Sequence, residues 1–154
     1  MKIRISIFFL IMVLMVVWAS STVFFFLGHC FSWQPSLTIS LIILYLFPGS
    51  IFGCIFLNDC SIQPQITPDF FKISSNHFYA FFIVLIFGYL TFLKDKQIMY
   101  LIIYLILLAV LLEICHLFIP QRSFQWSDLF GNLLGVFVVI FFKNLINKYG
   151  LFKK

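Results

Sequence analysis

Charged residues are scarce in this chain, and one long stretch has none at all. Only 10% of the 154 residues are Asp, Glu, Lys or Arg, whereas 63% are hydrophobic, and the mean hydropathy is +1.12. No charged side chain occurs in residues 5–58. A water-soluble domain of this size needs charged residues on the outward face of its helices. The shortage argues against a soluble fold and predicts a single integral membrane domain over residues 1–154.

Motifs of several soluble protein classes are also missing. The four cysteines, Cys30, Cys54, Cys60 and Cys115, include no C-x-x-C pair, so neither a zinc knuckle nor a thioredoxin-type motif is indicated. Cys30 and Cys60 can approach each other outside a membrane, but single buried thiols are the commoner case, and no disulfide is predicted. The ten Lys and Arg residues form no patch, which argues against nucleic acid as a partner. The expected partner is the lipid bilayer.

Long apolar stretches dominate what is present. A spanning helix needs about 20 apolar residues, because each adds about 1.5 Å across a hydrocarbon layer of about 30 Å. Lys2 and Arg4 ahead of the first stretch are typical of a signal peptide, but the stretch continues past Ser21, which predicts an uncleaved span. The sequence therefore predicts an all-α, polytopic transmembrane bundle. Its candidate spans are residues 5–27, 37–57, 78–93, 98–119 and 129–142.

The positions of the basic residues favour one topology, because short cytoplasmic loops retain Lys and Arg. Four spans, without residues 37–57, leave eight basic residues on one side and only Lys72 and Arg122 on the other, whereas five spans give six against four. Four spans with both termini in the cytoplasm are predicted. Pro48-Gly49 and Gly53 interrupt residues 37–57, which are expected to form a re-entrant or fifth hydrophobic segment.

Two ionisable residues, Glu113 and His116, lie three apart near the end of the fourth apolar stretch. This spacing puts both side chains on one face of a helix. Ionisable groups inside a membrane are expensive unless a partner or water compensates them, so they are candidates for function. A structural polar clamp near the interface explains the pair equally well.

The fifth stretch begins with another polar group. Asp128, Asn132 and Gly135 follow one another at helical spacing, which places a carboxylate, an amide and a gap on one stripe. Ser127 or Asp128 can instead cap the helix, and for Asp128 alone capping is the better interpretation. Gly131 and Gly135 form a G-x-x-x-G pair, which allows another helix to pack closely.

These polar residues are predicted to share one membrane face. His77 begins the third stretch, and Glu113 and His116 end the fourth. Asp128 and Asn132 begin the fifth, and consecutive spans alternate in direction. Arg122, in the loop between the fourth and fifth stretches, joins the same layer and can pair with Glu113, Asp128 or an anionic ligand. The candidate polar site comprises His77, Glu113, His116, Arg122, Asp128 and Asn132.

Several chemistries suit this set. The carboxylates and imidazoles can bind a divalent metal or exchange a proton, and Arg122 with a histidine can hold a phosphate on a lipid-linked precursor. No nucleophile elbow, phosphate-binding glycine loop or H-E-x-x-H is present. The residues therefore assign no metal, no cofactor and no catalytic group, and they leave open whether the protein is an enzyme.

Residues 113–135 resemble the VanZ-like family of small membrane proteins. In that family a helix ends with a glutamate, a Pro-Gly-Arg-like turn follows, and the next helix begins with Asp, Asn and Gly. Residues 77–82 look like the family's His-Phe-x-x-Phe helix start, so the resemblance covers about residues 68–147. The residues that match in type and order are Glu113, Pro120, Arg122, Asp128, Asn132 and Gly135.

The chain also departs from the family pattern. His116 stands where glutamine is usual, Gln121 replaces the glycine of the turn, and Ile73 and Ser74 stand where the family has Asp-Lys. The family takes its name from a protein associated with resistance to teicoplanin, and its biochemical activity is unassigned. The resemblance implies a bacterial envelope protein whose outward-facing polar site engages a cell-wall precursor, a lipid or a glycopeptide antibiotic. A membrane enzyme acting on a lipid-linked phosphate or sugar is the alternative, and a purely structural helix clamp is a second one.

Overall fold

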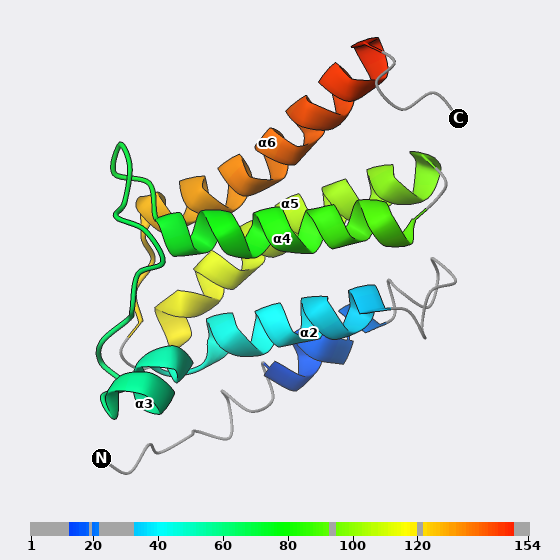
Figure 1. Ribbon diagram of the computed structural model, residues 1–154. Helices are drawn as coiled ribbons and strands as arrows, with labels where there is room; N and C mark the ends of the chain where they lie inside the picture. Colours follow the sequence, from blue (N-terminus) through cyan, green and yellow to red (C-terminus); the bar gives the residue numbers. More distant parts are fainter. Residues whose placement is uncertain (1–12, 19, 22–32, 93–94, 120–121, 150–154) are drawn as a thin grey trace.

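The structure is a computed structural model that describes residues 13–18, 20–21, 33–92, 95–119 and 122–149. Within these ranges the chain is helical and contains no β-sheet, so the all-α prediction is confirmed (Figure 1). Residues 13–18 and 20–21 are helical, and the rest of the first predicted span lies outside the described residues. The later elements are α2 (Trp33–Leu46), α3 (Ile51–Leu57), α4 (Ser75–Thr91), α5 (Asp95–Cys115), the 3₁₀ helix η1 (His116–Phe118) and α6 (Trp126–Tyr149).

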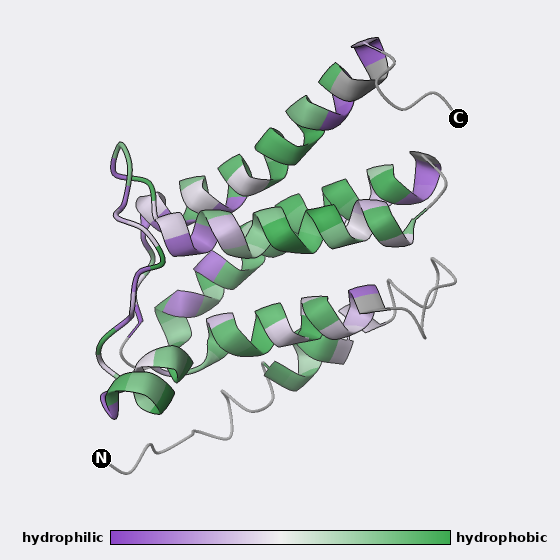
Figure 2. Ribbon diagram, in the orientation of Figure 1, coloured by the Kyte–Doolittle hydropathy of each residue, from purple (hydrophilic) through white to green (hydrophobic). Residues whose placement is uncertain are grey.

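Two of the described helices are long and apolar enough to cross a membrane, Lys96–Phe118 and Trp126–Leu145. A third crossing results if α2 and α3 count as one broken span. α4, with 17 residues, is apolar but shorter, at about 25 Å. Hydrophobic residues dominate the middle of the helices, and hydrophilic ones gather near their ends (Figure 2). The membrane character predicted from composition therefore agrees with the structure.

The second apolar stretch breaks where Pro48-Gly49 predicts. α2 and α3 are bent by 80° at this break, and Gly49 has a φ of 90°, which a residue with a side chain rarely adopts. The predicted interruption at Gly53 is wrong, because Gly53 lies inside α3. Gly53 permits close packing instead, since a Cβ there would clash with the backbone carbonyl oxygen of Ile62.

A disulfide joins Cys54 of α3 to Cys60, six residues later. The expectation of unpaired thiols is therefore wrong for these two residues, although Cys115 is free and buried as expected. Cys30, the partner considered for Cys60, lies outside the described residues. The pairing was missed because the sharp turn after α3 brings the two residues together, and Asn58 adopts the left-handed conformation that this turn requires.

α6 packs most extensively against α4, with Gly131 and Gly135 at the contact. A Cβ on Gly131 would lie 2.6 Å from the carbonyl oxygen of Ser74, and one on Gly135 would lie 2.5 Å from that of Phe78. The backbones of the two helices therefore approach as closely as a G-x-x-x-G pair permits. A hydrogen bond of 3.1 Å from the Ser74 amide to the Ser127 carbonyl ties the starts of the helices together.

α2 runs antiparallel to α4 and alongside it. The Gln34 amide at the start of α2 donates to the carbonyl of Val84 in the middle of α4, and Tyr45 at the end of α2 contacts His77 near the start of α4. The core between α2, α4, α5 and α6 is apolar. Its fully buried side chains include Ile42, Phe81, Leu85, Leu101, Leu105 and Leu112.

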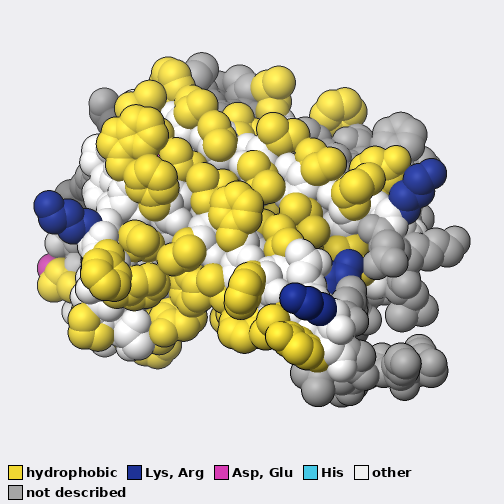
Figure 3. All heavy atoms as spheres, turned by 90° about the horizontal axis from the view of Figure 1, so that it is seen from above, with side chains coloured by type: hydrophobic (Ala, Val, Ile, Leu, Met, Phe, Trp, Pro, Cys, Tyr) yellow, Lys and Arg dark blue, Asp and Glu magenta, His cyan; other side chains and the backbone are white. Residues whose placement is uncertain are grey.

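The bundle has two different ends. We call the end with α3, residues 58–74, η1 and the start of α6 the pocket end, and the opposite end, with Lys96, Lys143 and Lys148, the lysine end (Figure 1). Hydrophobic side chains cover most of the face seen from above, and basic side chains lie at its left edge and in its right-hand half (Figure 3).

Candidate functional site

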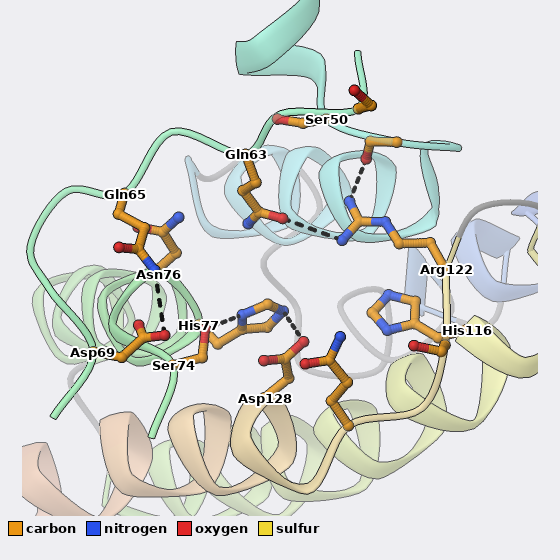
Figure 4. Close-up of a pocket in the computed structure, with 14 residues that line it drawn as sticks. Ser50, Gln63, Gln65, Asp69, Ser74, Asn76, His77, His116, Arg122 and Asp128 are labelled. Atoms are coloured by element: carbon orange, nitrogen blue, oxygen red, sulfur yellow. Dashed lines mark hydrogen bonds and ion pairs between the residues drawn. The ribbon is translucent and has the colours of Figure 1, made fainter. Parts of the chain in front are cut away.

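A polar cavity of about 260 Å³ lies at the pocket end. Its walls come from the turn after α2, the loop of residues 58–74, the start of α4, η1, the segment before α6 and the first turn of α6. Side chains from these segments point toward one another across it (Figure 4). Four of the six predicted site residues line this cavity, namely His77, His116, Arg122 and Asp128.

His77 and Asp128 face each other from the first turns of α4 and α6. The His77 Nε2 atom lies 3.6 Å from Asp128 Oδ2, and the other ring nitrogen lies 2.8 Å from the hydroxyl oxygen of Ser74 (Figure 4). α6 begins at Trp126, before both residues proposed as its cap. Asp128 therefore stands in the first helical turn, where its charge is favourable to the helix dipole and still free to reach His77.

Glu113 and His116 form a buried pair at the end of α5. His116 Nδ1 lies 3.3 Å from Glu113 Oε1, and His116 Nε2 lies 3.0 Å from the backbone carbonyl oxygen of Tyr45. Because a carbonyl oxygen only accepts hydrogen bonds, the proton of that contact lies on His116 Nε2. A hydrogen bond between Nδ1 and Glu113 then needs a second proton, either on the imidazole or on the carboxyl group. The backbone N–H of Gln125 also donates to Glu113 Oε1, at 2.8 Å.

Asn132 is fully buried one turn after Asp128, and its partner is Tyr45 of α2. The Tyr45 hydroxyl donates to the side-chain oxygen of Asn132, and its ring lies edge-on to His77 with centroids 4.9 Å apart. Sequence reasoning missed Tyr45, which connects three of the predicted site residues. The available signal was a tyrosine within residues 41–46, which are otherwise leucine and isoleucine, since a buried tyrosine needs a hydrogen-bond partner.

Arg122 does not form either ion pair suggested for it. Its guanidinium donates to the backbone carbonyl of Gly49 and, at 3.4 Å, to the side-chain oxygen of Gln63 (Figure 4). Burial lowers the pKa of Arg122 from its ordinary value, while the carboxylates of Asp128 and Glu113 act in the opposite direction. The group stays a cation, because guanidinium does not deprotonate in proteins. Its Nε atom is buried and has no hydrogen-bond partner among the described residues.

The loop of residues 58–74 is held onto α4 by side chains that the sequence did not single out. Asp69 accepts a 3.0 Å hydrogen bond from the backbone N–H of Ser75, so it caps α4 from outside the helix. Asn76 donates to the carbonyl of Pro64 and accepts from the N–H of Ile66. This loop therefore forms a fixed wall of the polar cavity.

An apolar cavity of about 500 Å³ adjoins the polar one. It lies between α2, α3, α4 and residues 63–66, and its lining includes Leu41, Phe56 and Ile83. The two cavities share six lining residues, so they meet along a common wall. No sequence feature indicated this second cavity, because it depends on the bend between α2 and α3.

Three site residues offer atoms that could hold a metal ion. One ligand atom each from His77, Glu113 and Asp128 lies within 4.8 Å of the other two. These residues come from α4, α5 and α6, so only the packing of three helices brings them together. Contacts link five of the six predicted residues directly or through Tyr45, whereas Arg122 contacts Gly49 and Gln63.

Comparisons with known proteins identify no relative. No protein-family model matches the chain, and no curated protein and no solved structure is significantly similar to it.

Proposed function

We propose that this is a VanZ-like, multi-pass protein of the bacterial envelope whose pocket end faces outward and binds an anionic, lipid-linked ligand. The resemblance of residues 113–135 supports the family, and the joined cavities support the ligand class. An amphipathic molecule needs a polar site and an apolar site in contact, and these cavities have a common wall. That wall consists of Ser50, Gln63, Gln65, Asn76, His77 and Arg122.

The apolar cavity suits a hydrocarbon chain that enters from the bilayer. Phe52, Phe56, Ile66 and Ile83 line it and are exposed, by 50%, 73%, 69% and 45%. Exposed apolar residues around an opening are favourable where lipid, rather than water, surrounds the protein. The cavity volumes suit a headgroup and part of a chain better than a bulky glycopeptide antibiotic.

The contacts of Arg122 favour a ligand with an anionic headgroup. Its partners are a neutral carbonyl and a neutral amide, and no carboxylate within ion-pair distance of it occurs among the described residues. A partly buried cation with spare donors gains most from an anion that accepts charge-assisted hydrogen bonds. Phosphate suits the planar guanidinium, and Arg122 lies on the wall that the two cavities share.

Two independent features support the outward orientation of the pocket end. The Cys54–Cys60 disulfide belongs to this end, and disulfides persist in oxidising compartments outside the cytoplasm. The opposite end carries Lys96, Lys143 and Lys148, as expected for a cytoplasmic side.

The antiparallel contact of α2 with α4 supports five crossings in place of the expected four. If α4 crosses, α2 lies beside most of its length, with Tyr45 at His77 and Gln34 at Val84 and Gly88. A crossing by residues 5–27 then puts the N terminus outside and the C terminus in the cytoplasm. Reporter fusions at each end distinguish the two topologies. Opposite locations are expected, and two cytoplasmic termini would restore the four-span arrangement.

A binding experiment tests the ligand class. Purified full-length protein in detergent is titrated with a polyprenyl phosphate and, separately, with the corresponding uncharged polyprenol. We expect the phosphate to bind at least about 10-fold more tightly, because a hydrogen bond to a charged group contributes about 1.5–3 kcal/mol. Arg122→Gln should remove this difference.

Lys72→Gln is the matched control, because Lys72 is a basic residue of the same end that lines neither cavity. This variant should bind both lipids like the unmodified protein. Equal affinity for the two lipids, or equal losses in both variants, would overturn the proposal. If Arg122→Gln lowers only the melting temperature, the structural clamp is the better explanation.

A further inference from the structure

The cluster of His77, Glu113 and Asp128 contains a buried carboxylate oxygen that has no hydrogen-bond partner among the described residues. This oxygen is Oε2 of Glu113, a residue that is fully buried. Its other oxygen is already engaged by the Gln125 N–H and by His116. A buried carboxylate oxygen without a partner is strongly unfavourable, and a cation is the partner that compensates it best.

Each of the three side chains is tethered through one atom and leaves another free. Ser74 engages His77 at Nδ1, which leaves Nε2 turned toward Asp128. Ser127 donates to Asp128 Oδ1 at 3.2 Å, which leaves Oδ2 turned toward His77. Glu113 follows the same pattern, with Oε1 held and Oε2 free. Hydrogen bonds that orient ligands from behind are typical of metal sites, where they set the tautomer of the histidine.

The distances between the three ligand atoms are slightly longer than those in a metal site. Tetrahedral bonds of about 2.0 Å put neighbouring ligand atoms about 3.3 Å apart. His77 Nε2 and Asp128 Oδ2 are already 3.6 Å apart, and all three ligand atoms lie within 4.8 Å of one another. Rotation of the free Glu113 carboxyl oxygen toward the other two closes the remaining distance.

We propose that His77, Glu113 and Asp128 bind one divalent transition-metal ion, Zn²⁺ or Mn²⁺. One imidazole and two carboxylates form a ligand set for these ions, and three protein ligands leave a coordination position open. His77 and Asp128 line the polar cavity, so the open position faces the space proposed for the anionic headgroup. An oxygen of that headgroup can then be held by the metal and by Arg122 together.

Metal binding is tested with the ions alone. Full-length protein is purified in detergent, stripped with a chelator, and equilibrated with Zn²⁺ or Mn²⁺. Bound metal is counted by mass spectrometry, and affinity is measured by calorimetry. We expect about one ion per chain, with affinity lowered at least about 10-fold by Glu113→Gln and by Asp128→Asn, each of which preserves side-chain shape.

Asp69→Asn is the matched control, because Asp69 is a carboxylate of the same cavity wall outside the cluster. It should retain the ion, and a circular dichroism spectrum verifies the fold of every variant. Absence of stoichiometric binding, or equal affinity in the cluster variants and the control, would overturn the proposal. Arg122→Gln should keep the ion, so failure of the lipid proposal and failure of the metal proposal are distinguishable.

Discussion

At the lysine end of the bundle the basic side chains reach outward, whereas at the pocket end polar side chains are buried against one another. Lys96 and Lys148 are exposed. The Lys148 ammonium lies over the ring of the adjacent Tyr149, and long lysine stems let a charge at the end of a helix reach lipid headgroups. Glu113, His116 and Asn132 are at most 1% exposed, and each forms a hydrogen bond with a distant part of the chain. The first arrangement needs only a membrane, and the second needs the packed helices.

The largest expected effect comes from separating α4 and α6, which hold the two sides of the pocket end. Gly131→Ala and Gly135→Ala each place a methyl group against backbone atoms of α4, which should destabilise the protein by about 1–3 kcal/mol, and the double variant by more. The apparent melting temperature in detergent measures this loss.

Gly88→Ala is the control, because its methyl group would meet mainly the flexible end of the Leu101 side chain. A smaller loss is expected there. If all three variants melt alike, close backbone contact between α4 and α6 is not what holds the pocket end together.

Tyr45→Phe should have the next largest effect. The change removes the hydroxyl that bonds to Asn132, keeps the ring, and leaves a buried amide oxygen without its donor, at a cost of about 1–3 kcal/mol. Tyr100→Phe is the same change at an exposed position, 49% accessible, and should alter stability by less than about 0.5 kcal/mol. Thermal melts of the two variants compare a buried and an exposed hydroxyl directly, and equal losses would contradict the contrast between the ends.

Opening the disulfide should lower the free energy of unfolding by about 2 kcal/mol. The effect is modest because the loop that the disulfide closes between Cys54 and Cys60 is short. In a Cys30→Ser background, a membrane-impermeant thiol reagent should label these cysteines in intact cells only after reduction. Labelling without prior reduction would contradict the disulfide, and labelling restricted to permeabilised cells would contradict the outward orientation.

The smallest effect is expected at the lysine end. The Lys143 ammonium lies 5.2 Å from the centre of the Tyr89 ring, a cation–π contact that contributes about 0.5–1 kcal/mol at an exposed site. Lys143→Gln should lower the melting temperature by less than Tyr45→Phe does. A larger loss would mean that this end, too, depends on specific tertiary contacts.

Much of the fold was predictable, and the limits of the prediction have physical causes. The stretches 78–93 and 98–119 correspond closely to α4 and α5 with η1, because apolar length alone identifies them. α6 extends beyond 129–142 at both ends, since hydropathy does not detect the polar first and last turns of a helix. The site residues were chosen for their cost inside a membrane. Tyr45 and the Gly49 carbonyl escaped that criterion, because neither carries a charge.

The amino-acid sequence by itself determined that the chain is helical and membrane-embedded, because backbone groups and apolar side chains in lipid permit little else. It also determined which polar residues end and begin the helices. Only the tertiary structure decided that Tyr45 reaches Asn132, that Arg122 contacts Gly49 and not a carboxylate, and that three ligand-type side chains converge. Those contacts join segments far apart in the chain, and they depend on the bend after α2 and on the glycines that let α6 approach α4.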